Sequence, residues 1–89
     1  MRTIKFAWRE EAGKYSLAVE YSRMWPFEIE EIEQIAAKWG FAVDSTGQRQ
    51  LGDFSGRWTP PESAEAIPAM RNDLRAIGCV TIFEGEEAE

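Results

Sequence analysis

The chain carries one pattern of apolar residues and glycine twice, and this repetition constrains the fold more than any other feature. The two copies have the same spacing, Ile29, Ile32, Ala36, Trp39 and Gly40 against Ile67, Met70, Leu74, Ile77 and Gly78. Such spacing predicts an amphipathic helix that ends at a glycine in each copy. Similar phrases precede the helices, YSRMWP at 21–26 and FSGRWTP at 54–60. We therefore predict two β-β-α units; a true internal repeat and a chance likeness of short motifs both fit the pattern.

Residues 3–21 are predicted to form an antiparallel hairpin. Large apolar side chains occupy every second position in residues 3–8 and again in residues 15–21, as in strands with one buried face. The polar segment 10–14 between them contains Gly13 and is short enough for a hairpin loop. The two strands are therefore expected to pair.

Both helices have recognisable boundaries, although the start of the second is ambiguous. The first is predicted from about Pro26, a residue that suits a first helical turn, to Trp39. In the second copy Pro68 lies inside the apolar stripe, where proline removes a hydrogen bond or kinks the helix. Two starts are therefore open: a kinked helix from about Glu62, or a regular helix from Pro68.

Three further strands complete a β-β-α-β-β-α-β order, at 41–44, 53–59 and 79–84. Residues 15–84 alone have the element order of ferredoxin-like folds. That fold gives the strand at 15–21 two neighbours and leaves no free side for residues 3–8, yet the short loop favours their pairing. The strand order is therefore left open.

The predicted fold class is α+β, with a mainly antiparallel five-stranded sheet and both helices on one face. Residues 1–84 are expected to form a single compact domain, and residues 85–89 a frayed acidic tail. The side chains expected in the core are Ile4, Phe6, Trp8, Leu17, Val19, Ile32, Ala36, Trp39, Met70, Leu74, Val80 and Ile82.

Histidine and cysteine usage excludes most catalytic chemistry. The chain has no histidine and one cysteine, Cys79, so Ser-His-Asp and Cys-His catalysis, cysteine zinc clusters and intrachain disulfides are excluded. It also lacks a Walker loop, a GxGxxG fingerprint and EF-hand spacing. Loop 45–50 has hydroxyls and an arginine that could hold an anion, but we interpret it as a connection. We expect no cofactor, no metal and no enzymatic activity.

Location and partner class follow from hydropathy and charge. No apolar run approaches the roughly 18 residues of a membrane span, and the first residues lack a signal-peptide core, so a cytoplasmic protein is expected. The net charge of −6 comes with scattered basic residues, which makes direct nucleic-acid binding unexpected.

The acidic residues gather in two clusters. Glu28, Glu30, Glu31 and Glu33 lie in the first predicted helix, and Glu84, Glu86, Glu87 and Glu89 lie at the end of the chain. The helix cluster is either a recognition surface for a basic partner or a solvated face favoured by the helix dipole. A continuous negative surface formed by both clusters would favour the recognition surface.

A second candidate is the pair Trp25 and Trp58, each close to an arginine, Arg23 and Arg57. Tryptophan and arginine are enriched in interface hot spots, so these residues could anchor a partner. Alternatively, each tryptophan packs beneath its helix.

The leading hypothesis is a small acidic protein-binding domain, an adaptor or an inhibitor of the kind that phages and mobile elements encode. Its partner would be another protein with a basic surface. The alternative is a small-ligand or sensor module with a groove near Trp25 and Trp58. A carboxylate-based metal-dependent enzyme is a third, weaker hypothesis.

Overall fold

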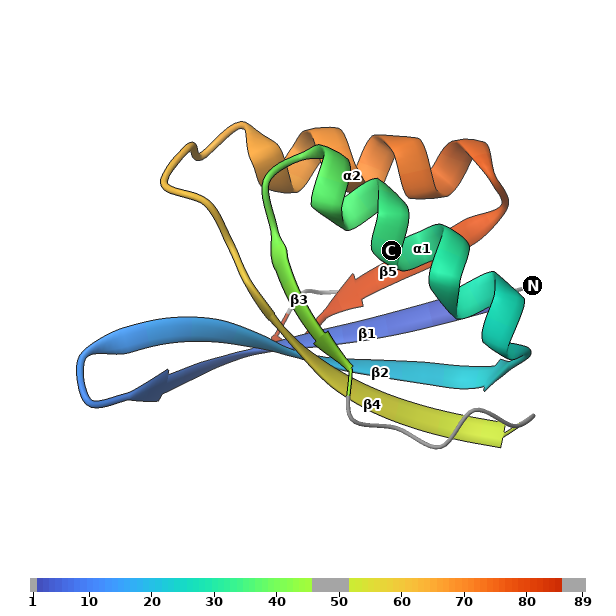
Figure 1. Cartoon of the computed structure of the whole chain (residues 1–89), viewed down its shortest axis with the longest axis horizontal. Coiled ribbons are helices and arrows are strands. Elements are labelled where there is room, and N and C mark those ends of the chain that lie inside the picture. Colours follow the sequence, from blue (N-terminus) through green and yellow to red (C-terminus); the bar gives the residue numbers. More distant parts are fainter. Residues whose placement is uncertain (1, 46–51, 86–89) are drawn as a thin grey trace.

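The structure, a computed structural model that describes residues 2–45 and 52–85, is a five-stranded mixed sheet with both helices on one face (Figure 1). Its elements are β1 (Arg2–Glu11), β2 (Lys14–Met24), α1 (Pro26–Lys38), β3 (Ala42–Ser45), β4 (Gly52–Thr59), α2 (Ala66–Ala76) and β5 (Cys79–Phe83). The α+β class and the β-β-α-β-β-α-β order are thus confirmed. The predicted anion loop and acidic tail fall largely on residues 46–51 and 86–89, outside the described part.

The strand order β3-β4-β2-β1-β5 corrects the ferredoxin-like expectation. β1 lies between β2 and β5 and so takes the place beside β2 that the last strand would otherwise hold. Since β1 is antiparallel to β2, a last strand that also runs antiparallel to β2 must be parallel to β1, as β5 is. The other three pairs are antiparallel, so the sheet is mixed. The tight hairpin causes this order, because its loop can join only neighbouring antiparallel strands.

The hairpin of β1 and β2 is longer than predicted. A turn of only two residues, Ala12 and Gly13, joins the strands, with φ angles of 52° and 79°. Positive φ at both positions is typical of the turn that matches the twist of a two-stranded ribbon. Pairing continues to Glu11 opposite Lys14, and the end of the hairpin projects past the helix layer (Figure 1). We call residues 8–17 the hairpin arm.

The core lies between the helices and the side of the sheet that faces them. The ring of Phe6 lies 5.2 Å from that of Trp58 and 4.9 Å from that of Phe83, between ring centroids. The predicted core residues Ile4, Phe6, Leu17, Val19, Ile32, Ala36, Met70 and Leu74 are all buried. Met70 and Leu74 of α2 are buried at the positions that correspond to Ile32 and Ala36 of α1, so both apolar stripes face the core.

Three predicted core residues are exposed instead. Val80 and Ile82 are 37% and 36% exposed. The register of β5 turns Cys79 and Phe83 toward the helices, and it therefore turns Val80 and Ile82 toward the open face of the sheet. Trp8 is 46% exposed, because it lies at the base of the hairpin arm. Trp39 is partly buried against the edge of the core.

α2 begins between the two predicted starts, at Ala66. Pro68 therefore falls in the first turn, where backbone N–H groups have no partner within the helix. It neither kinks α2 nor removes one of its hydrogen bonds.

The outer edge of β5 is covered by a side chain of α2. Arg71 donates from Nε to Oγ1 of Thr81 at 2.9 Å and from Nη2 to the carbonyl oxygen of Thr81 at 3.1 Å. Its guanidinium also lies 4.9 Å from the ring centroid of Phe83. The carbonyl of Thr81 is therefore occupied and cannot pair with a strand of another molecule, so Arg71 protects the middle of this edge.

Candidate functional site

A bulge at the end of β2 decides which side chains lead into α1. The register between β2 and β4 shifts between Tyr21 and Met24, and Arg23 has a φ angle of 51°, unusual for a residue other than glycine. The irregularity lets both Tyr21 and Met24 face the core, where they are 1% and 0% exposed. Trp25, the next residue, consequently points outward and is 49% exposed.

The four glutamates of α1 do not form one uniform surface. Glu28 accepts the backbone N–H of Trp25 at 3.4 Å and pairs with Arg2, with 3.5 Å between Oε2 and Nη1. Glu33 is partly buried, whereas Glu30 and Glu31 are exposed. Only Glu30 and Glu31 are therefore fully presented to a partner.

Arg2 ties the start of α1 to the end of α2. Besides pairing with Glu28, its guanidinium donates to the carbonyl oxygen of Ile77, the residue that ends α2. A cation at a helix C-terminus and an anion at a helix N-terminus are both favourable. The start of α1, where the aromatic side chains lie, is thus braced by a contact with β1.

Phe27 is the functional candidate that sequence reasoning missed. It is 68% exposed, the most exposed of the large apolar side chains in the described part of the chain. Helical spacing places it on the same face of α1 as Glu30, Glu31 and Gln34, all of them exposed. The signal was available, because Phe27 lies outside the stripe of Ile29, Ile32 and Ala36. We call the five residues Trp25, Phe27, Glu30, Glu31 and Gln34 the α1 patch.

The structure does not bring Trp25 and Trp58 together. Trp58 is 0% exposed and packs against Phe6 and Phe41, so its indole belongs to the core. It pairs with Leu17 on β2, seven residues before Met24, so the two tryptophans belong to opposite ends of β2. A single groove formed by both indoles is absent.

The two arginines also lie apart. Arg57 is on the open face of the sheet, where its Nη1 is 3.5 Å from Oε1 of Glu11. Arg23 is exposed within the bulge before Trp25. Of the two predicted arginines, only Arg23 is close in sequence to the α1 patch.

Glu84, the one member of the second acidic cluster in the described part of the chain, does not extend the first cluster. Glu84 follows β5 and pairs with Arg9, with 3.4 Å between Oε2 and Nη1. This pair lies on the open face, away from the helices. Glu86, Glu87 and Glu89 lie outside the described residues. Glu84 therefore does not join the two clusters into one continuous negative surface.

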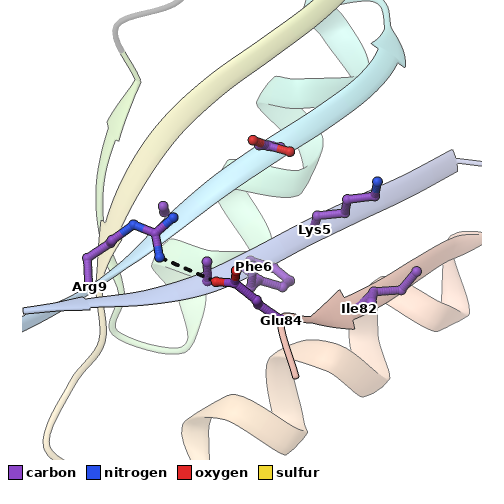
Figure 2. Close-up of a pocket in the computed structure, with 8 residues that line it drawn as sticks. Lys5, Phe6, Arg9, Ile82 and Glu84 are labelled. Atoms are coloured by element: carbon purple, nitrogen blue, oxygen red, sulfur yellow. Dashed lines mark hydrogen bonds and ion pairs between the residues drawn. The ribbon is translucent and has the colours of Figure 1, made fainter. Parts of the chain in front are cut away.

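The open face of the sheet has a shallow hollow of about 240 Å³ (Figure 2). Its lining residues are Lys5, Phe6, Ala7, Arg9, Ala18, Glu20, Ile82 and Glu84. Ala7 and Ala18 are opposite each other on β1 and β2, and their small side chains make the hollow. Small-molecule pockets usually hold roughly 300–1,000 Å³ and enclose most of the ligand. The hollow is below that range and its charges are balanced, so it does not support a small-ligand site.

Neither the thiol of Cys79 nor the described acidic side chains form a catalytic or metal site. Cys79 is 3% exposed; burial raises the pKa of its thiol, nearby Glu31 and Glu28 raise it further, and Arg2 opposes them. The thiol thus stays protonated and unsuited to act as a nucleophile. Within residues 2–45 and 52–85, no group of three or more acidic or cysteine side chains is arranged to hold a metal ion.

Comparison with known proteins identifies no relative. No protein-family model matches the chain, and no curated protein or solved structure matches it significantly. No helix in the part of the chain that the structure describes has both the length and the apolar character to cross a membrane.

Proposed function

We propose that this chain is a non-enzymatic protein-binding domain and that the α1 patch is its principal contact surface. The observation that carries the proposal is the exposure of Trp25 and Phe27, 49% and 68%, at the start of the helix that also presents the exposed carboxylates of Glu30 and Glu31. Large aromatic side chains in water leave apolar area unburied, and such side chains are enriched in interface hot spots. An adaptor or an inhibitor is the class of protein that such a surface suits.

The charge of the patch indicates the kind of partner. The chain carries a net charge of −6, and neither Glu30 nor Glu31 has a cationic partner in any ion pair among the described residues. A partner with an apolar pocket flanked by lysine or arginine would complement both features. The aromatic side chains would then supply most of the affinity, and the carboxylates would mainly speed association.

The test compares two variants of the patch in capture experiments from lysate and in titrations of each captured protein. The anchor variant combines Trp25→Ala with Phe27→Ala, and the charge variant combines Glu30→Gln with Glu31→Gln. A matched control, Glu20→Gln with Asp44→Asn, removes two exposed carboxylates elsewhere.

A partner of the patch is a protein that the wild type and the control capture and the anchor variant does not. We expect the charge variant to bind it more weakly at low salt and to lose much of the dependence on ionic strength. Melting temperatures close to the wild type establish that the variants are folded. If every captured protein binds all variants equally, with the same salt dependence, the α1 patch is only a solvated surface.

A further inference from the structure

The hairpin arm forms one wall of a second surface. The arm includes the start of β2, whereas the α1 patch follows the end of β2. Trp8 and Tyr15 lie on the side of the arm that continues the core face of the sheet, but they are 46% and 60% exposed. Ile4 and Phe6, farther back along β1 on the same side, are almost completely buried. The change occurs because the arm projects past the helices (Figure 1), so its core-like face has no cover.

The opposite wall is the segment that follows β4. Pro60, Pro61 and Glu62 line the same groove as Trp8 and Tyr15, with a volume of about 500 Å³. We call these five residues the arm groove. Apart from Glu62, its lining consists of aromatic and proline side chains, so it is a mainly apolar surface.

Both walls are held in place before any ligand arrives. Consecutive prolines fix the backbone, because each ring restricts φ. The ring of Pro61 lies close to Gly40, where an added Cβ would be 3.3 Å from the Cβ of Pro61. On the other wall, the ring of Trp8 lies 6.5 Å from that of Phe83, between centroids, which anchors it to the core. A preorganised groove loses little conformational entropy when it binds.

The chemistry of the groove points to one class of ligand. The polyproline II conformation has no internal hydrogen bonds, and its carbonyl oxygens are free to accept. The indole N–H of Trp8 and the phenol of Tyr15 are donors of the type such a backbone requires. Trp8 and Tyr15 are diagonal neighbours across β1 and β2, since Trp8 is opposite Leu17 and Tyr15 is opposite Glu10. Two neighbouring rings can each hold a proline, as in other aromatic-lined grooves for proline-rich segments.

We infer that the arm groove binds a proline-rich peptide segment in polyproline II conformation that carries a basic residue. Three carboxylates at or near the groove favour a basic residue in the ligand. Glu62 lines the groove, Glu10 is opposite Tyr15 on the arm, and Glu65 is exposed shortly after Glu62. A second copy of this chain would bring the same carboxylates together, and its net charge of −6 opposes that contact. The inference is independent of the α1 patch, which shares no residue with the groove.

The experiment titrates the full chain with a synthetic polyproline peptide that carries arginine at one end. A glycine-serine peptide with the same arginines has the charge without the conformation and serves as the ligand control. Calorimetry measures the affinity, and the indole N–H signals of the tryptophans report the site. We expect the Trp8 signal to move and the Trp25 signal to stay.

The decisive variant is Tyr15→Ala, because this side chain is 60% exposed and contributes little to the fold. Removal of an aromatic anchor is expected to weaken binding of the polyproline peptide about tenfold or more. Glu62→Gln should weaken it less and mostly at low salt, since an exposed charge is screened. The control Trp25→Ala should bind as the wild type does, so failure of the α1 patch and failure of the groove are distinguishable.

Three results would each overturn the inference. The first is a wild-type chain that does not bind the polyproline peptide, or binds the glycine-serine peptide equally well. The second is a Tyr15→Ala variant with unchanged affinity. The third is a concentration-dependent dimer in sedimentation that Tyr15→Ala dissociates, which would show that a second copy occupies the groove.

Discussion

The indole N–H of Trp58 is buried and finds no acceptor among the described residues, which makes this side chain a sensitive test of the core. A buried donor without a partner costs about 1–3 kcal/mol relative to one that is satisfied. Trp58→Phe removes that donor and keeps an aromatic ring near Phe6 and Phe41, whose ring centroids lie 5.2 Å and 5.8 Å from that of Trp58. The substitution therefore removes the cost of the unsatisfied donor, but it also reduces packing in the core.

The loss has two parts. The volume difference between the two side chains, about 40 Å³, costs roughly 1 kcal/mol at about 24 cal/mol per Å³ of residual cavity, and the apolar atoms that are removed add their lost transfer free energy. The total therefore falls within the range of the gain from removing the unsatisfied donor. We expect the free energy of unfolding of Trp58→Phe to lie within about 1 kcal/mol of the wild type, whereas Trp58→Ala should lose about 3–5 kcal/mol.

Urea unfolding followed by far-UV circular dichroism measures these differences, and Trp39→Phe is the matched control. The Nε1–H of Trp39 does have an acceptor, Oδ2 of Asp73 at 2.8 Å. The same substitution there removes a hydrogen bond to a carboxylate, so it should destabilise the chain more than Trp58→Phe does. If Trp58→Phe is instead as harmful as Trp58→Ala, the unpartnered N–H is not a cost and the reasoning fails.

Two further substitutions test contacts of α2. Arg71→Lys keeps the charge but loses the planar guanidinium that reaches both Thr81 oxygens, so we expect a loss of about 1–2 kcal/mol in urea unfolding. An unchanged urea midpoint would mean that the edge of β5 does not depend on these bonds. For Asp73, the hydrogen bond from Trp39 and then the one from Lys38 hold the pKa of the carboxyl below its ordinary value. Its stabilisation is therefore present above the ordinary pKa and is lost as pH falls below about 4 through the lowered pKa. Asp73→Asn should reduce the fall in urea midpoint between about pH 5 and about pH 2, and an identical fall in both proteins would contradict this assignment.

Periodicity in the sequence was sufficient to predict the helices, the strands and most of the core residues. Every helix and strand lies where it was predicted, with boundaries displaced by a few residues, because the apolar stripes that specify them are local. The predictions that failed depend on contacts between distant segments. Val80 and Ile82 alternate with residues of equal apolar character, so only the pairing of β5 with β1 decides which set is buried. The strand order likewise depends on which neighbour β2 takes.

The candidate site was only partly predictable for a related reason. Glu30, Glu31 and Trp25 are candidates from the sequence alone, and the structure places Trp25 at the N-cap of α1 and the two glutamates within its first two turns. The likeness of YSRMWP to FSGRWTP suggested that Trp25 and Trp58 are equivalent, but a bulge precedes Trp25 and regular strand surrounds Trp58. One extra residue in a strand reverses the side on which the next side chain falls. No pattern in the sequence marked that bulge.

The position of β1 inside the sheet has a consequence for synthesis of the chain. The hairpin of β1 and β2 is synthesised before the rest of the domain, and β4 can then pair with β2, but the other edge of β1 has no partner until β5 follows α2. Throughout that interval the nascent chain presents an unpaired strand with Ile4 and Phe6 on one face, and such strands are prone to associate with other chains. The final parallel pairing joins segments from the two ends of the domain, so its loop closure is slow. The free edge of β1 therefore stays open to association until the last strand of the domain is available.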